Sequence, residues 1–364
     1  TNAKDDQQLS TLMESIRQEI TGTGWQKMGL LLWKLGENNK AEELYNMLLN
    51  EAPNENHESY CYHCLGMIKY NLGQYNEAIK FYQKSLDIKE KTLPPNDPNL
   101  ASSYNNIGIV YKNMGEYSKA LSSYERSLEI WKIALPPNHP DLASSYLNIG
   151  TVYGNMGEYS KALSSYERSL EIQKIALPPN HPNLASSYQG IGAVYDLMGE
   201  YSKALSSYER SFEIQKIALP PNHPALAASY NNIGMVYDNM GEYSKALSSY
   251  ERSLEIQKIA LPPNHPDLAS SYQGIGALHH NMGEYSKALS SYERSLEIQK
   301  IALPPNHPDL ASSYNNIGSV YDNMGEYSKA LSSYERSLEI RKIALPPNHP
   351  HLASSYINIG AKYL

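Results

Sequence analysis

The chain has 364 residues, 41% of them hydrophobic, and a formal net charge of −7. Because Lys and Arg form no basic stripe that could neutralise phosphates, we expect no nucleic-acid ligand. No apolar run is long enough to span a bilayer, and the first residues lack the basic start and apolar centre of a signal peptide. We therefore expect no membrane partner and a cytoplasmic location. The only two cysteines, Cys61 and Cys64, exclude a disulfide framework.

Two short segments open the chain. Residues 1–21 are predicted to form an N-terminal segment with a capping helix, whose apolar residues are Leu9, Leu12, Met13, Ile16 and Ile20. Residues 22–58 are predicted to form a divergent, short pair of helices. They contain, in order, Trp25, Met28, Gly29, Leu32, Ala41, Tyr45 and Pro53. This spacing resembles the tetratricopeptide pattern W-x2-L-G-x2-Y, A-x3-F, P.

A longer unit of 42 residues then recurs to the end of the chain. Residues 59–100 are a divergent copy, and residues 101–352 are six near-identical copies. These start at Ala101, Ala143, Ala185, Ala227, Ala269 and Ala311. Residues 353–364 begin a further copy and are predicted to form its first helix only. A period of this length is typical of stacked repeats, so we expect one elongated solenoid in place of separate globular domains.

Each copy is predicted to form two antiparallel helices, and its positions are numbered 1–42 from its first alanine. Apolar residues at positions 4, 7, 8 and 11 share one face of the first helix. Those at positions 17, 20, 21, 24 and 28, together with Ile133 at position 33, are assigned to the buried face of the second. Gly115 suits a left-handed turn between them. Pro136 ends the second helix, and Pro140 fits the first turn of the next, with Asn138 or His139 as its cap.

The copies resemble the 42-residue tetratricopeptide repeats of kinesin light chains. The shared features are the pair Asn105 and Asn106 before Ile107 and Gly108, the x-LEI-x-K-x-x-L end of the second helix, and the x-x-HP-D-L-A start of the next copy. The resemblance covers residues 22–364. It implies an all-α fold, a right-handed α-solenoid (superhelix) of antiparallel helix pairs, in which a concave groove lined by the first helices holds an extended peptide.

Differences between the copies fall mainly on one stripe of the first helix. Eight of the eleven variable positions lie in that helix, and positions 5, 6, 9 and 12 lie roughly opposite its predicted buried face. Free drift of exposed residues is one explanation. It accounts poorly for the invariant surface of the second helix, so we favour tuning of a ligand-binding groove. The candidate peptide-binding residues are Asn105, Asn106, Lys112, Asn148, Gln189, Asp196, Asn231, Asn232, Asp238, Gln273, His280, Asn315, Asn316, Asp322 and Asn358.

The composition of this stripe indicates the kind of ligand. An Asn amide can donate and accept, so the position-6 Asn can pair with a peptide backbone without selecting side chains, and the resemblance implies this use. Gly190 and Gly274 replace that Asn in two copies, at a cost of about 1 kcal/mol each relative to Ala. They provide room for a bulky ligand side chain or reflect the copying of one accident. Position 12 is Asp in three copies and Lys only at Lys112, which favours a neutral or basic segment over an acidic one.

No residue pattern predicts catalysis. His57, Cys61, Cys64 and His63 lie close together in the sequence, but structural zinc sites usually draw ligand pairs from two segments, so we interpret the cysteines as packing residues and assign no metal site. Glycine-rich phosphate loops, nucleophile elbows and paired catalytic carboxylates are not found. We therefore expect no enzyme activity and no cofactor.

Three functions are compatible with the sequence. The leading hypothesis is a protein–protein interaction scaffold that binds an extended peptide in the groove. The second is a structural protein that self-associates head to tail, because the last helix leaves Tyr356, Ile359 and Tyr363 without a second helix to cover them. The third is the targeting arm of an enzyme whose catalytic domain lies outside this chain, which starts at Thr1 and not at Met.

Overall fold

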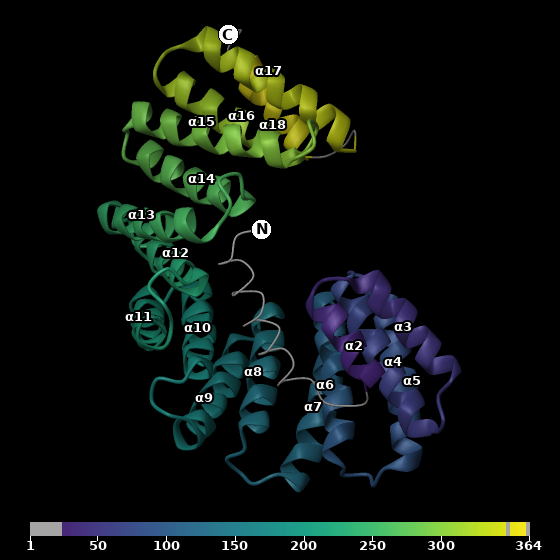
Figure 1. Cartoon of the computed structure of the whole chain (residues 1–364). Coiled ribbons are helices and arrows are strands. Elements are labelled where there is room, and N and C mark those ends of the chain that lie inside the picture. The colour runs from purple at the N-terminus through teal and green to yellow at the C-terminus, as the bar shows by residue number, and fades with distance from the viewer. Residues whose placement is uncertain (1–23, 347–349, 362–364) are drawn as a thin grey trace, which may run out of the picture. The chain divides into compact units, whose positions relative to one another are not determined.

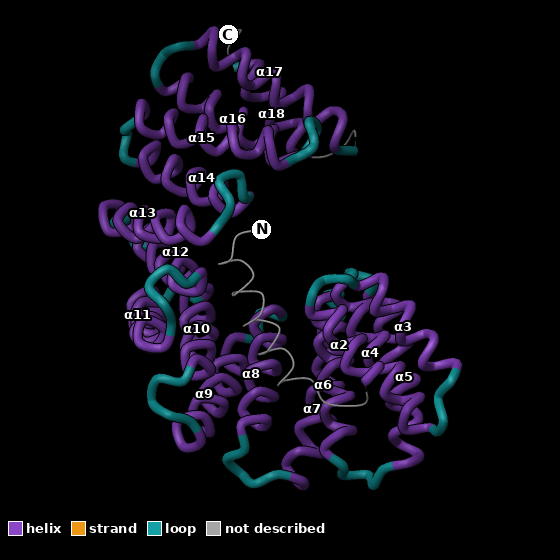
Figure 2. The backbone as a smooth tube through the Cα atoms, in the orientation of Figure 1, coloured by secondary structure: helices purple, strands orange, loops and turns teal. Residues whose placement is uncertain are grey.

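The computed structural model describes residues 24–346 and 350–361 of the chain. Within these ranges the structure is made only of helices and loops, as the tube view shows (Figure 2). The chain divides into two compact units, one that ends at Leu177 and one that starts at Pro178. The predicted capping helix of residues 1–21 lies outside the described residues. The prediction of an all-α fold is confirmed.

The first unit contains four helix pairs, in which each helix packs against the next in the sequence (Figure 1). The helices are α2 (Gly24–Lys34), α3 (Asn38–Asn50), α4 (Glu55–Asn71), α5 (Tyr75–Thr92), α6 (Pro98–Asn113), α7 (Tyr117–Ala134), α8 (Pro140–Asn155) and α9 (Tyr159–Ala176).

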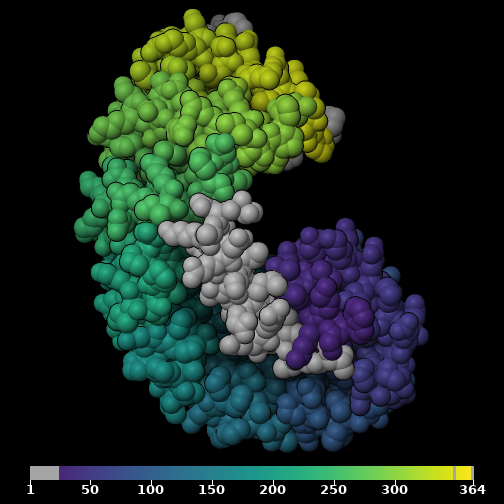
Figure 3. Space-filling view, in the orientation of Figure 1, coloured from purple at the N-terminus to yellow at the C-terminus, as the bar shows by residue number. Residues whose placement is uncertain are grey.

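The second unit contains four helix pairs and one further helix, and on the face drawn in Figure 3 its layers follow one another without a break. The helices are α10 (Pro182–Leu197), α11 (Tyr201–Ala218), α12 (Pro224–Asn239), α13 (Tyr243–Ala260), α14 (Pro266–Asn281), α15 (Tyr285–Ala302), α16 (Pro308–Asn323), α17 (Tyr327–Ala344) and α18 (Pro350–Gly360). In both units each helix packs on its neighbours in the sequence, so the prediction of a solenoid of helix pairs is confirmed.

Helix ends lie where the local sequence signals predict them. Gly115 adopts a φ of 75° in the turn after α6, a backbone conformation that residues with a Cβ resist. Pro140 occupies the first turn of α8, and the imidazole Nδ1 of His139 accepts a hydrogen bond from the backbone N–H of Asp141 at 3.2 Å. The divergent copy uses Asp97 for the same purpose, since its carboxylate accepts from the N–H of Asn99 at 2.8 Å. The histidine at position 39 is therefore a helix cap.

The two helices of a repeat approach closely because position 8 is glycine. A Cβ added to Gly108 would lie 2.7 Å from Cε1 of Tyr124, which is fully buried between α6 and α7. The same glycine and tyrosine pair recurs in the other repeats. A second contact fixes the crossing of the helices, because the buried hydroxyl of Ser127 donates to the carbonyl oxygen of Ala101 at 2.8 Å. Shape and hydrogen bonding together set one geometry that every copy repeats.

The core differs from the predicted faces at two points. The first helix also buries positions 1, 3 and 10, while its tyrosines at positions 4 and 11 are only half-buried. Tyr104, for example, reaches the surface and donates to a carboxylate oxygen of Glu90 at 2.5 Å. The assignment of Ile133 to the buried face is wrong, since this side chain is 67% exposed. Position 33 lies nine residues after Tyr124, which at about 100° per residue places it on the opposite side of α7.

Candidate functional site

The variable stripe is joined from one repeat to the next by pairs of asparagines. Asn148 on α8 donates through Nδ2 to Oδ1 of Asn105 on α6 at 3.0 Å, and Asn358 on α18 donates in the same way to Asn315 on α16 at 3.0 Å. Position 6 of one copy therefore lies beside position 5 of the copy before it. Each amide in these pairs has further donor or acceptor capacity, because an Asn side chain can make about four hydrogen bonds.

A second row of contacts runs about two helical turns further along, between positions 12 and 13. Asn239 donates to a carboxylate oxygen of Asp196 at 3.0 Å, and Asn323 donates to Nε2 of His280 at 2.7 Å. In the first unit Asn113 donates to the hydroxyl of Tyr70 at 2.6 Å. The predicted site residues Asp196 and His280 are thus held in place by a position-13 Asn of the next repeat. The sequence suggested these asparagines as further polar contacts for a ligand and did not indicate the bond to the preceding repeat.

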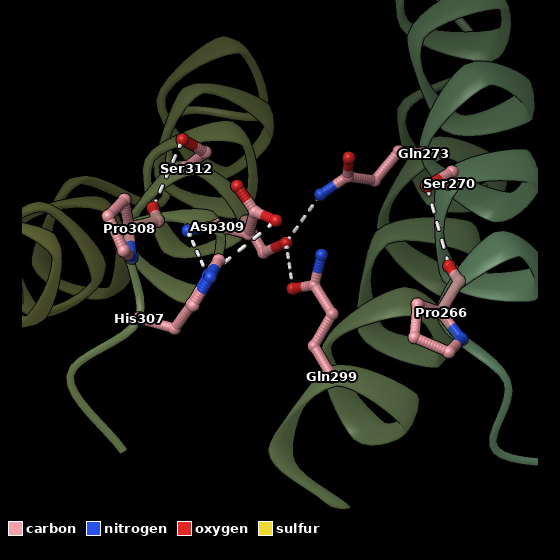
Figure 4. A network of polar contacts seen from close by, with 9 residues as sticks. Pro266, Ser270, Gln273, Gln299, His307, Pro308, Asp309 and Ser312 are labelled. Carbon is pink, nitrogen blue, oxygen red and sulfur yellow. Dashed lines mark hydrogen bonds and ion pairs between the residues drawn. The ribbon is translucent and has the colours of Figure 1, made fainter. Parts of the chain in front are cut away.

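Where position 5 is Gln, its longer side chain reaches a different partner (Figure 4). Gln273 on α14 donates to the hydroxyl of Ser313 on α16 at 2.7 Å. That hydroxyl donates in turn to Oε1 of Gln299 at 2.7 Å, so three side chains close the space between the helices. Gln189 approaches Ser229 at 3.3 Å in the same arrangement.

Sequence reasoning missed the residue at position 31. This residue belongs to the second helix of its copy. Its side chain forms a hydrogen bond with the serine at position 3 of the following copy, on the first helix of that copy. The pairs are Lys89 with Ser103, Gln215 with Ser229, Gln257 with Ser271, Gln299 with Ser313, and Arg341 with Ser355. The available signal was that position 31 varies while its exposed neighbours on the second helix do not.

Several predicted site residues keep their polar atoms unused. Asn106, Asn231, Asn232 and Asn316 are half-buried, and their side-chain amides make no hydrogen bond within the described part of the chain. Lys112, at position 12 of the first full copy, is also half-buried and has no hydrogen bond or ion pair there. A half-buried amide without a partner has hydrogen-bonding capacity that a ligand can satisfy.

The position-12 aspartates make the stripe acidic in the second unit. Burial raises the pKa of Asp238, and this carboxylate makes no hydrogen bond within the described residues. Burial, followed by the charge of Asp196, raises the pKa of Tyr208 to about 12. Asp322 acts on Tyr334 in the same direction, again after burial. Asp196 and Asp238 thus place negative charge at position 12 of two consecutive repeats.

The two cysteines lie in the core of the first unit. Both thiols are buried on α4, and burial is the main cause that raises the pKa of each to about 11. A thiol that stays protonated at neutral pH is a poor nucleophile, since the thiolate is the reactive form. In residues 24–346 and 350–361, no group of three or more His, Cys, Asp or Glu side chains is arranged to hold a metal ion. None of the helices described has the length and apolar character needed to cross a bilayer.

Solved structures with a similar fold include a Podospora anserina protein named for kinesin light chain, with nearly identical TPR-like repeats. It is 23% identical, with a TM-score of 0.52, and the match covers 57% of this chain and 98% of that one. BtubC (BKLC) of P. vanneervenii is 22% identical, with a TM-score of 0.54 and coverage of 65% and 94%. The quorum sensor NprR of B. thuringiensis is 15% identical, with a TM-score of 0.64 and coverage of 93% and 94%. These likenesses concern the fold.

Family models identify the repeats themselves. One tetratricopeptide repeat model matches residues 58–133, 110–175, 141–217, 267–343 and 309–364. Two further tetratricopeptide repeat models match residues 226–267 and residues 25–55. No curated protein matches the chain. Since these ranges include most of the sequence, and the helix pairs and their spacing agree with them, the chain belongs to the tetratricopeptide repeat family.

Proposed function

We propose that the chain is a protein–protein interaction scaffold that holds an extended peptide along the stripe of positions 5, 6, 9 and 12. The observation that carries this proposal is the set of half-buried amides without partners, of which Asn231 and Asn232 lie side by side on α12. An extended peptide exposes one N–H and one C=O group per residue, and an Asn amide can pair with both. Family membership supports the same role, because repeat solenoids bind partners along extended surfaces.

The charge of the stripe supports a neutral or basic segment. Asp238 has no partner among the described residues, and Lys112 is the one basic residue at position 12 of the full copies. An acidic peptide would bring like charges together at half-buried sites, which costs affinity.

The test is selection of peptides from a random dodecapeptide library displayed on phage, with the intact chain as bait. Peptides recovered with the intact chain are then measured against the double variant Asn232→Ala and Asn316→Ala by isothermal titration calorimetry. We expect about a tenfold loss of affinity, because each lost hydrogen bond is worth about 0.5–1.5 kcal/mol. The matched control removes two exposed connector amides, Asn222→Ala and Asn306→Ala, and should bind as the parent does. Equal binding by both double variants would contradict the proposal.

A second candidate is self-association through α18. Tyr356 and Ile357 on this helix are 54% and 69% exposed, an apolar pair that a second copy could cover. Light scattering distinguishes the candidates, because a mass that stays at 40.8 kDa over a wide range of concentration would remove this one.

A further inference from the structure

A hollow of about 730 Å³ opens between α12 and α14, beside the C-terminal end of α13, all within the second unit. Asn231, Asn232 and Met235 line it from α12, Gly274 from α14 and Tyr250 from α13. It lies on the variable stripe, since these residues of α12 and α14 occupy positions 5, 6, 9 and 6 of their copies.

Four substitutions that set particular copies apart meet in this hollow. Ala225 replaces the Asp, Asn or His of the other copies at position 41, and Ala228 replaces the serine that the other five near-identical copies have at position 2. Met235 is the only methionine at position 9 of the six near-identical copies, and Gly274 replaces an asparagine. Three of the four remove side-chain atoms and the fourth adds a flexible apolar group. The hollow is therefore a product of the differences between copies and not of the repeat itself.

The space between α14 and α16 shows what the hollow lacks. There Gln273, Ser313 and Gln299 close the gap by hydrogen bonds (Figure 4). Between α12 and α14, Asn231 is shorter by one methylene, and Gly274 has no side chain to donate to it. A Cβ built on Gly274 would have no atom within 4 Å.

Two residues of α13 are more exposed at this hollow than their counterparts in neighbouring repeats. Tyr250 is half-buried, whereas its counterparts Tyr208 and Tyr292 are buried. Gln257 is also half-buried, although Gln215 and Gln299 at the same position are buried. The wall thus presents part of an aromatic ring that the neighbouring repeats keep covered.

The wall has the chemistry of a pocket for an uncharged group. Its apolar residues include Met235, Tyr250, Leu261 and three alanines, and it contains no Lys or Arg. Its one ionisable carboxylate, Asp267, would repel an acidic group. Gln257 and Ser271 in this wall bond to each other, whereas the side-chain amides of Asn231 and Asn232 make no hydrogen bond within the described residues, so these two amides can pair with a peptide backbone.

We propose that this hollow receives one large apolar side chain of the bound peptide, of the Leu, Met or Phe class, while Asn231 and Asn232 hold the peptide groups on either side of it. The inference rests on the proposed function and names a specificity-determining subsite within it. Apolar burial supplies the selectivity here, because a backbone contact alone does not distinguish one residue from another.

The probes are N-acetyl amino acid amides, each of which carries one side chain between two peptide groups. The intact chain is labelled with ¹³C at its methionine methyl groups, and the Met235 signal, assigned by Met235→Leu, is followed by NMR. We expect the Leu, Met and Phe amides to shift this signal, with a Kd in about the millimolar range, and the Glu and Ala amides to leave it unchanged. Met324 and Met156, in turns outside the hollow, serve as internal references.

Two variants fill the hollow from opposite walls. Gly274→Asn restores the residue found at this position in other copies, and Ala228→Leu adds bulk from α12. Each should weaken binding of the Leu amide by about tenfold or more, since the apolar contact is lost. Ser290→Asn, the same residue type introduced at an exposed site on α15, should not.

Three results would overturn the inference. They are the absence of a Met235 shift with every amide, a shift that is equal for all amides, or a shift that grows with protein concentration alone, which would make a second copy the occupant. Library peptides that still bind the groove in any of these cases would leave the proposed function standing. If no library peptide binds, the proposed function fails whatever the amides do.

Discussion

Mild acid is expected to destabilise the N-terminal part of the first unit through His63. This residue lies on α4 at position 5 of its copy, with its ring centroid 5.5 Å from that of Tyr82 on α5. Its Nδ1 is buried and has no hydrogen-bond partner within the described residues. Burial, followed by the positive charge of Lys89, lowers the pKa of His63 from 6.5 to about 4. Lys89 cannot move away freely, because it donates to Ser103 on α6 at 2.8 Å.

The sign and size of this loss of stability follow from the difference between the pKa of His63 in the folded and in the unfolded chain. The unfolded chain takes up the proton near pH 6.5 and the folded chain only near pH 4, so this contribution to stability is complete above pH 6.5 and is lost as pH falls through that window. A lowering of about 2.5 pKa units corresponds to about 3 kcal/mol, of which about 2.4 kcal/mol is lost between pH 7 and pH 4.5. Because His63 as a residue is only half-buried, these values are upper limits.

The assay is urea unfolding at pH 7 and pH 4.5, with hydrogen exchange of peptides from α4 and α5 as the local measurement. His63→Gln places at this site the residue that two other copies use at position 5, and it has no ionisable group. We expect it to reduce the difference in unfolding free energy between the two pH values. The control is His57→Gln, at a residue that makes an exposed hydrogen bond to Asn54, and it should leave this difference unchanged. If His63→Gln loses as much stability on acidification as the parent does, the account of His63 is refuted.

Two further pairs of substitutions test packing and capping. Gly192→Ala should destabilise the second unit by about 1–3 kcal/mol in urea unfolding, since the added Cβ would lie 2.9 Å from Cδ1 of Tyr208. Gly274→Ala adds its Cβ in open space and should stabilise the unit by up to about 1 kcal/mol. A loss at both sites would show that the close approach is not the cause. His223→Ala should cost about 1 kcal/mol of stability, because it removes the cap of α12. His223→Asp should keep most of that stability, since Asp97 caps α6 in the same way. Equal stability of the two variants would contradict the role of His223 as a cap.

Features that depend on neighbours in the sequence could be predicted. The turn at Gly115, the start of α8 at Pro140 and the cap at His139 follow from backbone preferences and local hydrogen bonds, and the structure has all three. The helical period also identified the buried Ile107 and Leu128. The error at Ile133 arose because a spacing of five residues after Leu128 was accepted as part of the same face, whereas Ile130 is the residue that turns inward, at 1% exposure.

Features that depend on how repeats stack could not be predicted from the period. Position 31 belongs to the second helix of a copy. Nothing in that helix indicates that the side chain contacts the first helix of the following copy. The contact between Gln299 and Ser313 joins residues 14 apart across the connector, at a distance set by the angle between layers. The sequence did show that position 31 varies, as Trp131 and Arg341 replace Gln. Variation alone did not indicate what the residue touches.

The stacking rule changes how the variation between copies should be understood. The residue at position 5 of one copy contacts the residue at position 3 or 6 of the next copy. The shape and polarity of the space between two successive first helices therefore depend on residues from both copies. Asn105 with Asn148 gives a bonded pair, Gln273 with Ser313 gives a closed network, and Asn231 with Gly274 gives a hollow. A repeat moved to another place in the array would therefore change two spaces at once. Near-identical copies can in this way form a stripe of unlike spaces, and under the proposed function the order of copies along the chain becomes a determinant of specificity.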